Sequence, residues 1–92
     1  MRAIVHTVST PPKGATYDAL DLQIEINIPF VPTSGTGLKV TPSGDILTCD
    51  QVMWDINEPD LIRIFMKEPD DLPSLAWMLE EGWKSDLPNP IL

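Results

Sequence analysis

Cysteine and long apolar runs are scarce in this 92-residue sequence. Cys49 is the single cysteine, so no disulfide can form within the chain and no set of thiolates can hold zinc. No stretch approaches the roughly 20 consecutive apolar residues of a membrane-spanning helix. The first residues also lack the long apolar segment of a secretion signal. We therefore expect a protein of the reducing cytoplasm.

Residue sets for catalysis are equally scarce. A hydrolase triad needs a nucleophile, a base and an orienting acid, but His6 is the single histidine. Cys49 precedes Asp50, whose charge disfavours a reactive thiolate. The acidic stretch 55–60 lacks the glycine and the distant glutamate of a calcium-binding EF-hand loop. We expect no enzyme, no metal and no cofactor; a site shared between copies is the remaining route to catalysis.

Basic residues are few, and their shortage is confined to the second half of the chain. Six Lys and Arg face fourteen Asp and Glu, for a formal net charge of −8. Residues 1–44 balance three acids with three bases, whereas residues 45–92 carry eleven acids and three bases. Such a surface repels nucleic acid and anionic lipid and attracts a basic protein surface. The alternative is that the acidity only keeps a small domain soluble.

The composition is that of a folded domain, with 42% hydrophobic and 22% charged residues. Two domains are excluded because each half would be too small to bury a core. We expect one domain over residues 1–84 and an extended tail over residues 85–92, where two prolines prevent a helix.

The clearest pattern is a two-residue alternation over residues 20–30. Apolar side chains occupy every even position, namely Leu20, Leu22, Ile24, Ile26, Ile28 and Phe30, with Asp21, Gln23, Glu25 and Asn27 between them. This period places the apolar set on one face of a strand and the polar set on the other. The segment is therefore predicted to organise the core, and Pro29 to mark an edge or a bend.

Shorter β-prone segments accompany this strand at residues 2–8, 38–40, 45–55 and 61–67. In the last of them, Ile62, Ile64 and Met66 make the expected inner face. Phe65 belongs to the opposite face, where it is either covered by a helix or exposed.

Two local features predict a hairpin at residues 41–44 and a bend in the strand that follows it. Pro42 and Gly44 suit a type I turn, with Gly44 in the left-handed conformation. In the strand over residues 45–55, the side chains expected to face inward lie at odd positions up to Cys49 and at even positions, Val52 and Trp54, after it. That change predicts a β-bulge near Asp50 and Gln51.

A helix is predicted over about residues 72–82. Asp71 is a suitable N-cap and Pro73 fits the first turn. Gly82 can end the helix in the left-handed conformation, with Trp83 folding back on Met78. The expected buried stripe consists of Leu72, Leu75, Ala76, Leu79 and Trp83. Together these elements predict an α+β fold: four or five strongly bent antiparallel strands, similar to an SH3-like barrel, with one short C-terminal helix packed on them.

The partner-binding candidates are the acids of the second half and one tryptophan. Tryptophan is a favoured interface anchor, and Trp77 lies off the buried stripe; the alternative is that it covers the sheet edge or Phe65. The full set is Asp45, Asp50, Asp55, Glu58, Asp60, Trp77, Glu80 and Glu81. The polar face of residues 21–27 is a second candidate surface, or a plain solvated face.

In size and charge the chain resembles small phage-encoded inhibitors of the anti-restriction and anti-CRISPR class. That resemblance lies in composition and implies a protein–protein interaction module. Such an inhibitor would occlude a basic, nucleic-acid-binding surface of a larger protein or complex. The alternative is a structural or self-associating assembly subunit that uses strand addition through its edge and the Pro-rich tail, with Ile91 and Leu92 buried in a neighbour. We expect a monomer or a weak homo-oligomer.

Overall fold

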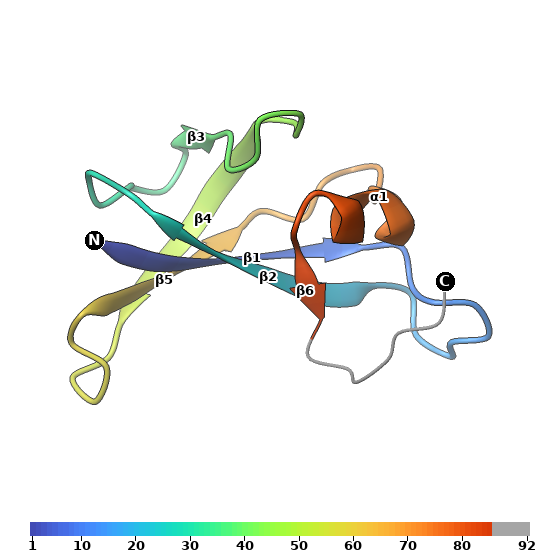
Figure 1. Ribbon diagram of the computed structural model, residues 1–92, viewed down its shortest axis with the longest axis horizontal. Coiled ribbons are helices and arrows are strands. Elements are labelled where there is room, and N and C mark those ends of the chain that lie inside the picture. Colours follow the sequence, from blue (N-terminus) through green and yellow to red (C-terminus); the bar gives the residue numbers. More distant parts are fainter. Residues whose placement is uncertain (86–92) are drawn as a thin grey trace.

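Two antiparallel hairpins form the centre of the fold in the computed structural model, which describes residues 1–85 (Figure 1). The strands are β1 (Arg2–Ser9), β2 (Leu20–Asn27), β3 (Gly37–Leu38), β4 (Leu47–Trp54), β5 (Leu61–Met66) and β6 (Lys84–Ser85). β1 pairs with β2 and β4 with β5, while β1 and β5 run parallel and join the hairpins. The sheet order is β3-β4-β5-β1-β2-β6.

The predicted α+β class is confirmed: the sheet is mostly antiparallel and curls strongly into an open half-barrel, with one short C-terminal helix (Figure 1). It has six strands rather than four or five, because the two-residue strand β6, which was not predicted, pairs with β2. The parallel pairing was not anticipated. It sets Ile62 beside Ala3 and Ile64 beside Val5, so both hairpins present apolar side chains to one face.

The core lies on that face. The odd positions of β1 and the even positions of β2 and β5 point into it, as the alternation predicts, and Leu22 and Ile64 are almost fully buried. Phe30 departs from the prediction and is exposed. β2 ends at Asn27, and Pro29 cannot donate to a ladder, so the chain leaves the buried face before reaching Phe30.

The predicted bulge and turn are both present. The β4–β5 register shifts between Cys49 and Gln51, and the Gly44 N–H donates to the Thr41 carbonyl at 3.1 Å. The left-handed conformation expected at Gly44 is wrong, since only Gly14, Gly35 and Gly82 have positive φ. Glycine serves there by its size, because a Cβ would overlap Thr41 Oγ1.

The helix α1 (Leu75–Glu80) begins three residues later than predicted, after Ser74 rather than Asp71. The segment before it bonds instead to the end of β1. Thr10 donates its N–H to the Pro73 carbonyl at 2.9 Å, and its Oγ1 accepts the Leu75 N–H at 3.0 Å. Proline also disfavours helical backbone at the residue before it, which delays the start further.

The helix ends as predicted. Gly82 has φ +105°, and the Trp83 N–H returns to the Met78 carbonyl at 3.1 Å. Leu75 and Met78 are the buried helix residues, whereas Ala76, expected in the stripe, is exposed. The short helix is therefore held against the core chiefly by its two buried side chains, Leu75 and Met78.

No helix among residues 1–85 is long and apolar enough to cross a membrane. The predicted tail begins with Ser85, which belongs to β6 and pairs with Leu22. The rest of that tail, including Ile91 and Leu92, lies outside the described residues.

Candidate functional site

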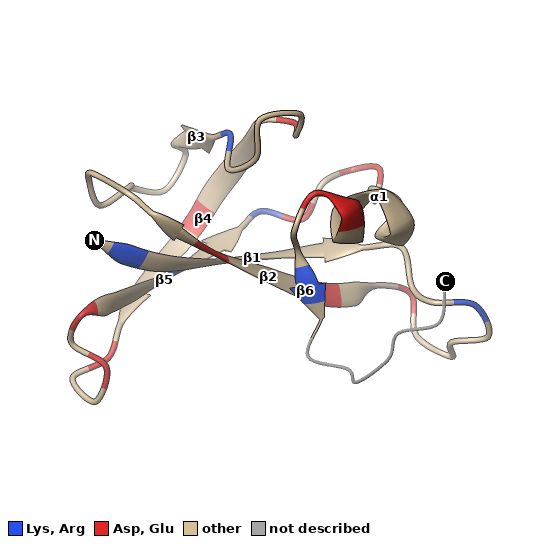
Figure 2. Cartoon of the chain, viewed as in Figure 1, with Lys and Arg blue, Asp and Glu red and all other residues tan. Residues whose placement is uncertain are grey.

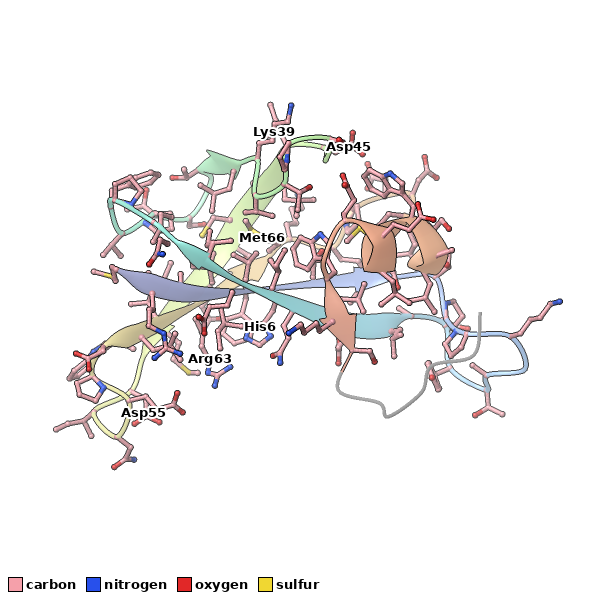
Figure 3. The ribbon with its side chains drawn as sticks, in the orientation of Figure 1. His6, Lys39, Asp45, Asp55, Arg63 and Met66 are labelled. Atoms are coloured by element: carbon pink, nitrogen blue, oxygen red, sulfur yellow. The ribbon has the colours of Figure 1, made fainter. Side chains whose placement is uncertain are left out.

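The predicted acidic residues divide into two groups that lie apart on the molecule (Figure 2). Asp45 belongs with Trp77, Glu80 and Glu81 around the helix α1. Asp55, Glu58 and Asp60 form the turn between β4 and β5, and Asp50 lies on β4 at the bulge. Figure 3 shows Asp45 and Asp55 far from each other. The predicted set is therefore two surfaces rather than one.

The first surface surrounds a hollow of about 390 Å³, here called the helix–hairpin pocket. Its walls come from the hairpin loop, the connection from β5 to α1, and the helix with its stop: Val40, Thr41, Gly44, Asp45, Ile46, Leu47, Pro69, Asp71, Leu72, Pro73, Trp77, Met78 and Trp83. The lining is chiefly apolar, with Asp45 and Asp71 contributing carboxylates. A volume of this size lies within the range of ligand pockets.

Local sequence features hold this pocket open. The turn at Gly44 keeps the hairpin loop compact, and buried Thr41 donates its Oγ1 hydrogen to Glu81 Oε1 at 3.4 Å. That bond ties the loop to the C-terminal end of the helix. On the other side, the left-handed Gly82 turns the chain so that Trp83 packs into the core beneath the pocket.

Trp77 and Trp83 both line the pocket, but they differ in burial. Trp83 is 4% exposed and forms part of the core, while Trp77 is half-buried and packs against it. Trp77 thus packs against the core and leaves part of its surface exposed, while its role as an interface anchor stays a prediction. Sequence analysis did not assign Trp83 or Asp71 to a site, although the Gly82 stop was the signal that would have placed Trp83 there.

The segments that frame the pocket carry unbalanced negative charge (Figure 2). Six acids belong to them and only two bases, Lys39 and Lys67; the acids are Asp45, Glu68, Asp70, Asp71, Glu80 and Glu81. Neither of the ion pairs described in the structure, Arg2–Glu25 and Arg63–Glu58, involves any of them. A cation approaching this surface therefore meets carboxylates that are free of a described ion pair.

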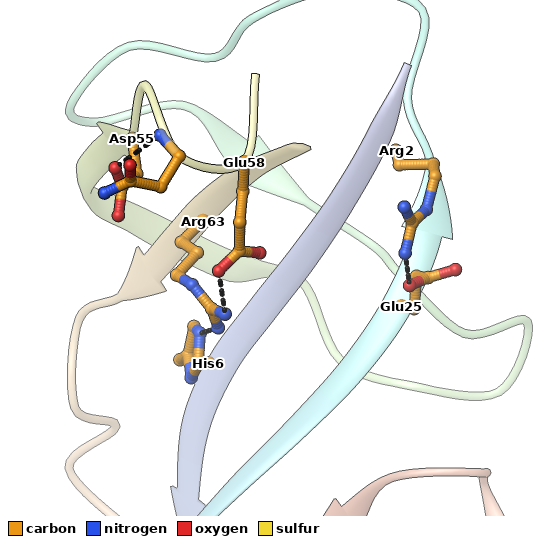
Figure 4. A network of polar contacts seen from close by, with 7 residues as sticks. Arg2, His6, Glu25, Asp55, Glu58 and Arg63 are labelled. Carbon is orange, nitrogen blue, oxygen red and sulfur yellow. Dashed lines mark hydrogen bonds and ion pairs between the residues drawn. The ribbon is translucent and has the colours of Figure 1, made fainter. Parts of the chain in front are cut away.

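The turn group is closer to neutral (Figure 4). Arg63 Nη2 lies 3.7 Å from Glu58 Oε1, and Asp55 Oδ1 accepts the Asn57 N–H at 2.9 Å. The pKa of Arg2 is raised chiefly by Glu25, and the charges of Asp60 and Glu58 raise it further. The three acids are thus partly offset, by Arg63 in an ion pair and by Arg2 at longer range, which the linear charge count does not reveal.

The polar face of β2, the second predicted surface, is also engaged. Arg2 donates to Glu25 Oε1 at 2.8 Å (Figure 4). This hydrogen bond, followed by the charge attraction, lowers the pKa of Glu25 and raises that of Arg2. β2 therefore presents a paired face there rather than an acidic one.

His6 has closer neighbours than the sequence suggested. Its ring stacks on Phe65 with centroids 4.6 Å apart and an interplanar angle of 11°, and Arg63 Nη1 lies 3.3 Å from its Nε2 (Figure 4). The parallel β1–β5 register brings His6 opposite Phe65. Phe65 is accordingly half-buried by this stack and not covered by the helix.

Cys49 is 1% exposed, and burial, followed by the nearby Asp50 charge, raises the pKa of its thiol. A neutral buried thiol packs and does not react. Within residues 1–85, no three His, Cys, Asp or Glu side chains come together as metal ligands would.

Trp54 differs most from its prediction. It was expected to point inward, yet it is 56% exposed, and its indole N–H donates to the Pro59 carbonyl at 3.0 Å. Trp54 is the last residue of β4, and the curled sheet extends beyond the core at this point. With Val52, Met1 and Val31 it lines a second hollow of about 630 Å³, here called the Trp54 groove.

The chain matches no protein-family model, and neither the curated proteins nor the solved structures contain a significant match. Any function must therefore be argued from the helix–hairpin pocket, the Trp54 groove and the charges around them.

Proposed function

We propose that the chain is an acidic protein-binding module that docks its helix–hairpin pocket on a basic surface of a larger protein. One observation supports this most directly: an open, tryptophan-lined pocket is framed by six acids and two bases. The acids provide long-range attraction, and the pocket provides an apolar anchoring point. Tryptophan in such a setting is a common interface hot spot.

The pocket suits a lysine or arginine side chain of the partner. The aliphatic stem of such a side chain can lie against Trp77 and Leu72, while its charged head reaches Asp45 or Asp71. A cation held beside an indole gains a further attraction from the ring's negative face. Nucleic acid is a poor ligand for the same surface, because its phosphates would face the six carboxylates.

Basic surfaces on proteins often serve to hold nucleic acid, so an acidic module seated on one would exclude it. This occlusion is the proposed mechanism of inhibition. The compositional resemblance to small anti-restriction and anti-CRISPR inhibitors supports the same role. Electrostatic steering should make association fast at low salt and slower as the charges are screened.

The test begins with affinity capture of partners from a native lysate. The captured protein is then purified, and its binding to nucleic acid is measured with and without the chain. We expect the chain to compete with nucleic acid and its association rate to fall about tenfold or more between 50 mM and 500 mM salt, both chosen to bracket physiological screening.

Variants assign the surface. Asp45→Asn combined with Asp71→Asn removes charge at the pocket without changing its shape, and Trp77→Ala removes the anchor. Asp18→Asn combined with Asp21→Asn is the matched control, because it removes the same charge at exposed positions away from the pocket. Binding that is insensitive to salt, or equally reduced by the control pair, would contradict the proposal.

A further inference from the structure

The outer edge of β4 is open over residues 50–54. At its start β4 is covered, since β3 pairs with Leu47 and Thr48 and the Cys49 N–H donates to the Thr36 carbonyl at 2.8 Å. Beyond Cys49, no strand among the described residues pairs with β4 on the side away from β5. A free edge of this kind is a template for an added strand.

Beyond Asp50 and the bulge at its start, this edge carries none of the usual protections against strand pairing. Native edges are commonly blocked by lysine or proline, and residues 50–54 contain neither. Met53 and Trp54 are instead exposed, and Ile56 follows in the turn with three quarters of its surface exposed. The bulge lies at the start of the segment, between Cys49 and Gln51, and leaves the rest regular.

The Trp54 groove lies beside this edge. Val52 and Trp54 form its wall on β4, and Met1, Val31 and Ile62 contribute apolar surface from other segments. An added strand would direct alternate side chains to the same side as Val52 and Trp54. The edge can thus supply backbone hydrogen bonds and the groove a place for an apolar side chain, the combination that strand-adding proteins use.

Charge identifies the occupant. Asp50 and Asp55 stand at the two ends of the open segment, both exposed and neither in a described ion pair. They are five positions apart, but the bulge adds one residue to β4, so a regular added strand covers the interval in four steps, about 14 Å. An extended segment with a basic residue at each end would complement them.

We propose that this edge binds an extended basic segment of a partner protein by strand addition. The segment carries Lys or Arg four positions apart, so that both point to the same face, and between them an apolar residue on the other face that enters the Trp54 groove. This inference uses a surface distinct from the helix–hairpin pocket and does not depend on what that pocket binds.

A second copy of the chain is a poorer occupant. Each copy carries a formal charge of −8. Pairing two copies along this edge brings the Asp50 and Asp55 carboxylates of both copies onto one short strand pair, and residues 50–55 contain no base to offset them. Two strongly acidic chains repel each other, whereas a basic segment is attracted.

The experiment titrates the isotope-labelled full chain with a capped pentapeptide, Lys-Val-Thr-Val-Lys, whose lysines share one face and whose valines share the other, while amide resonances are followed by NMR. We expect shifts confined to residues 50–56 and to the Trp54 indole N–H. The same peptide methylated on alternate backbone nitrogens should not bind, because strand addition needs those N–H groups. Replacing both lysines by glutamate should also abolish binding.

Variants of the chain complete the test. Asp50→Asn and Asp55→Asn should each weaken peptide binding about two- to fivefold, as opposite-charge cross-strand pairs do, while the control Asp21→Asn should not. Absence of β4 shifts at millimolar peptide, or equal binding of the methylated peptide, would overturn the inference. So would sedimentation showing a dimer that Asp50→Asn strengthens, since a second copy would then occupy the edge. Loss of the peptide effect alone leaves the helix–hairpin proposal standing, because that proposal is tested by different variants.

Discussion

Replacing Thr7 by valine should stabilise the protein. Thr7 lies on β1 opposite Leu22, faces the core and is 5% exposed. Its Oγ1 is buried without a hydrogen-bond partner among the described residues. A buried hydroxyl without a partner costs about 1–3 kcal/mol relative to its hydrated state. Valine has nearly the same shape, removes that cost and adds apolar contact.

We expect Thr7→Val to raise the free energy of unfolding by about 1–2 kcal/mol. In a domain of this size, each 1 kcal/mol corresponds to a melting temperature roughly 4–8 °C higher. Urea unfolding followed by tryptophan fluorescence measures the change, with an unaltered slope as evidence that both proteins unfold alike.

Two controls separate the hydroxyl from other causes. Thr7→Ser keeps the hydroxyl and loses a methyl group, so it should destabilise by about 1 kcal/mol. Thr48→Val makes the same exchange at an exposed strand position and should change little. If Thr7→Val unfolds at lower urea than the wild type, the hydroxyl is satisfied and the argument from its burial fails.

Three further predictions concern the helix stop, the thiol and the ion pair. Gly82→Ala should lower the free energy of unfolding, measured in urea, by about 1 kcal/mol, because the backbone at Gly82 has φ +105°, which disfavours a side chain. Steric overlap should add little, since a new Cβ would lie 3.7 Å from the nearest atom, which belongs to Ile24. Cys49 should resist alkylation until the protein unfolds, because its thiol is buried and its pKa is raised. The raised pKa also makes stability depend on pH. The contribution of the neutral thiol is complete below the pKa of the unfolded chain and is lost as the pH rises through the pKa of the folded protein. Glu25→Gln should lower the melting temperature slightly at pH 7 but not in acid. The lowered pKa of the Glu25 carboxylate contributes stability above the pKa of the unfolded chain, and that stability is lost as the pH falls through the pKa of the folded protein. Equal changes of melting temperature at both pH values would contradict the role of the Arg2–Glu25 pair.

The distribution of charge over the folded chain differs from its distribution along the sequence. The linear sequence places most acids after residue 44, and this suggests one acidic surface. In the folded chain the 55–60 turn meets Arg2 and Arg63, whereas the segments around the helix–hairpin pocket have only Lys39 and Lys67. The pocket is for that reason the better candidate for a basic partner, and Trp77 is part of it.

The open edge of β4 is proposed to make a second kind of contact. Carboxylates act over several ångströms and set which partners approach, whereas a strand edge requires an extended backbone at hydrogen-bonding distance. The two proposed surfaces therefore make different demands on a partner, and the charge and backbone variants described above distinguish them.

Features within one segment were predictable from the sequence, because they depend on local geometry. The two-residue period assigned the buried face of β2, the change of phase located the bulge after Cys49, and Gly82 located the end of α1. Each follows from backbone geometry or side-chain direction over a few residues. The α+β class followed from the same local patterns.

Contacts between distant segments were decided only by the tertiary structure. The parallel pairing of β1 with β5 placed His6 on Phe65 and Arg63, and the bond from Thr10 to the Pro73 carbonyl delayed the helix. The curl of the sheet left Trp54 beyond the core and set its groove beside an open edge. No periodicity encodes such meetings, because they depend on how whole hairpins pack to bury their apolar faces together.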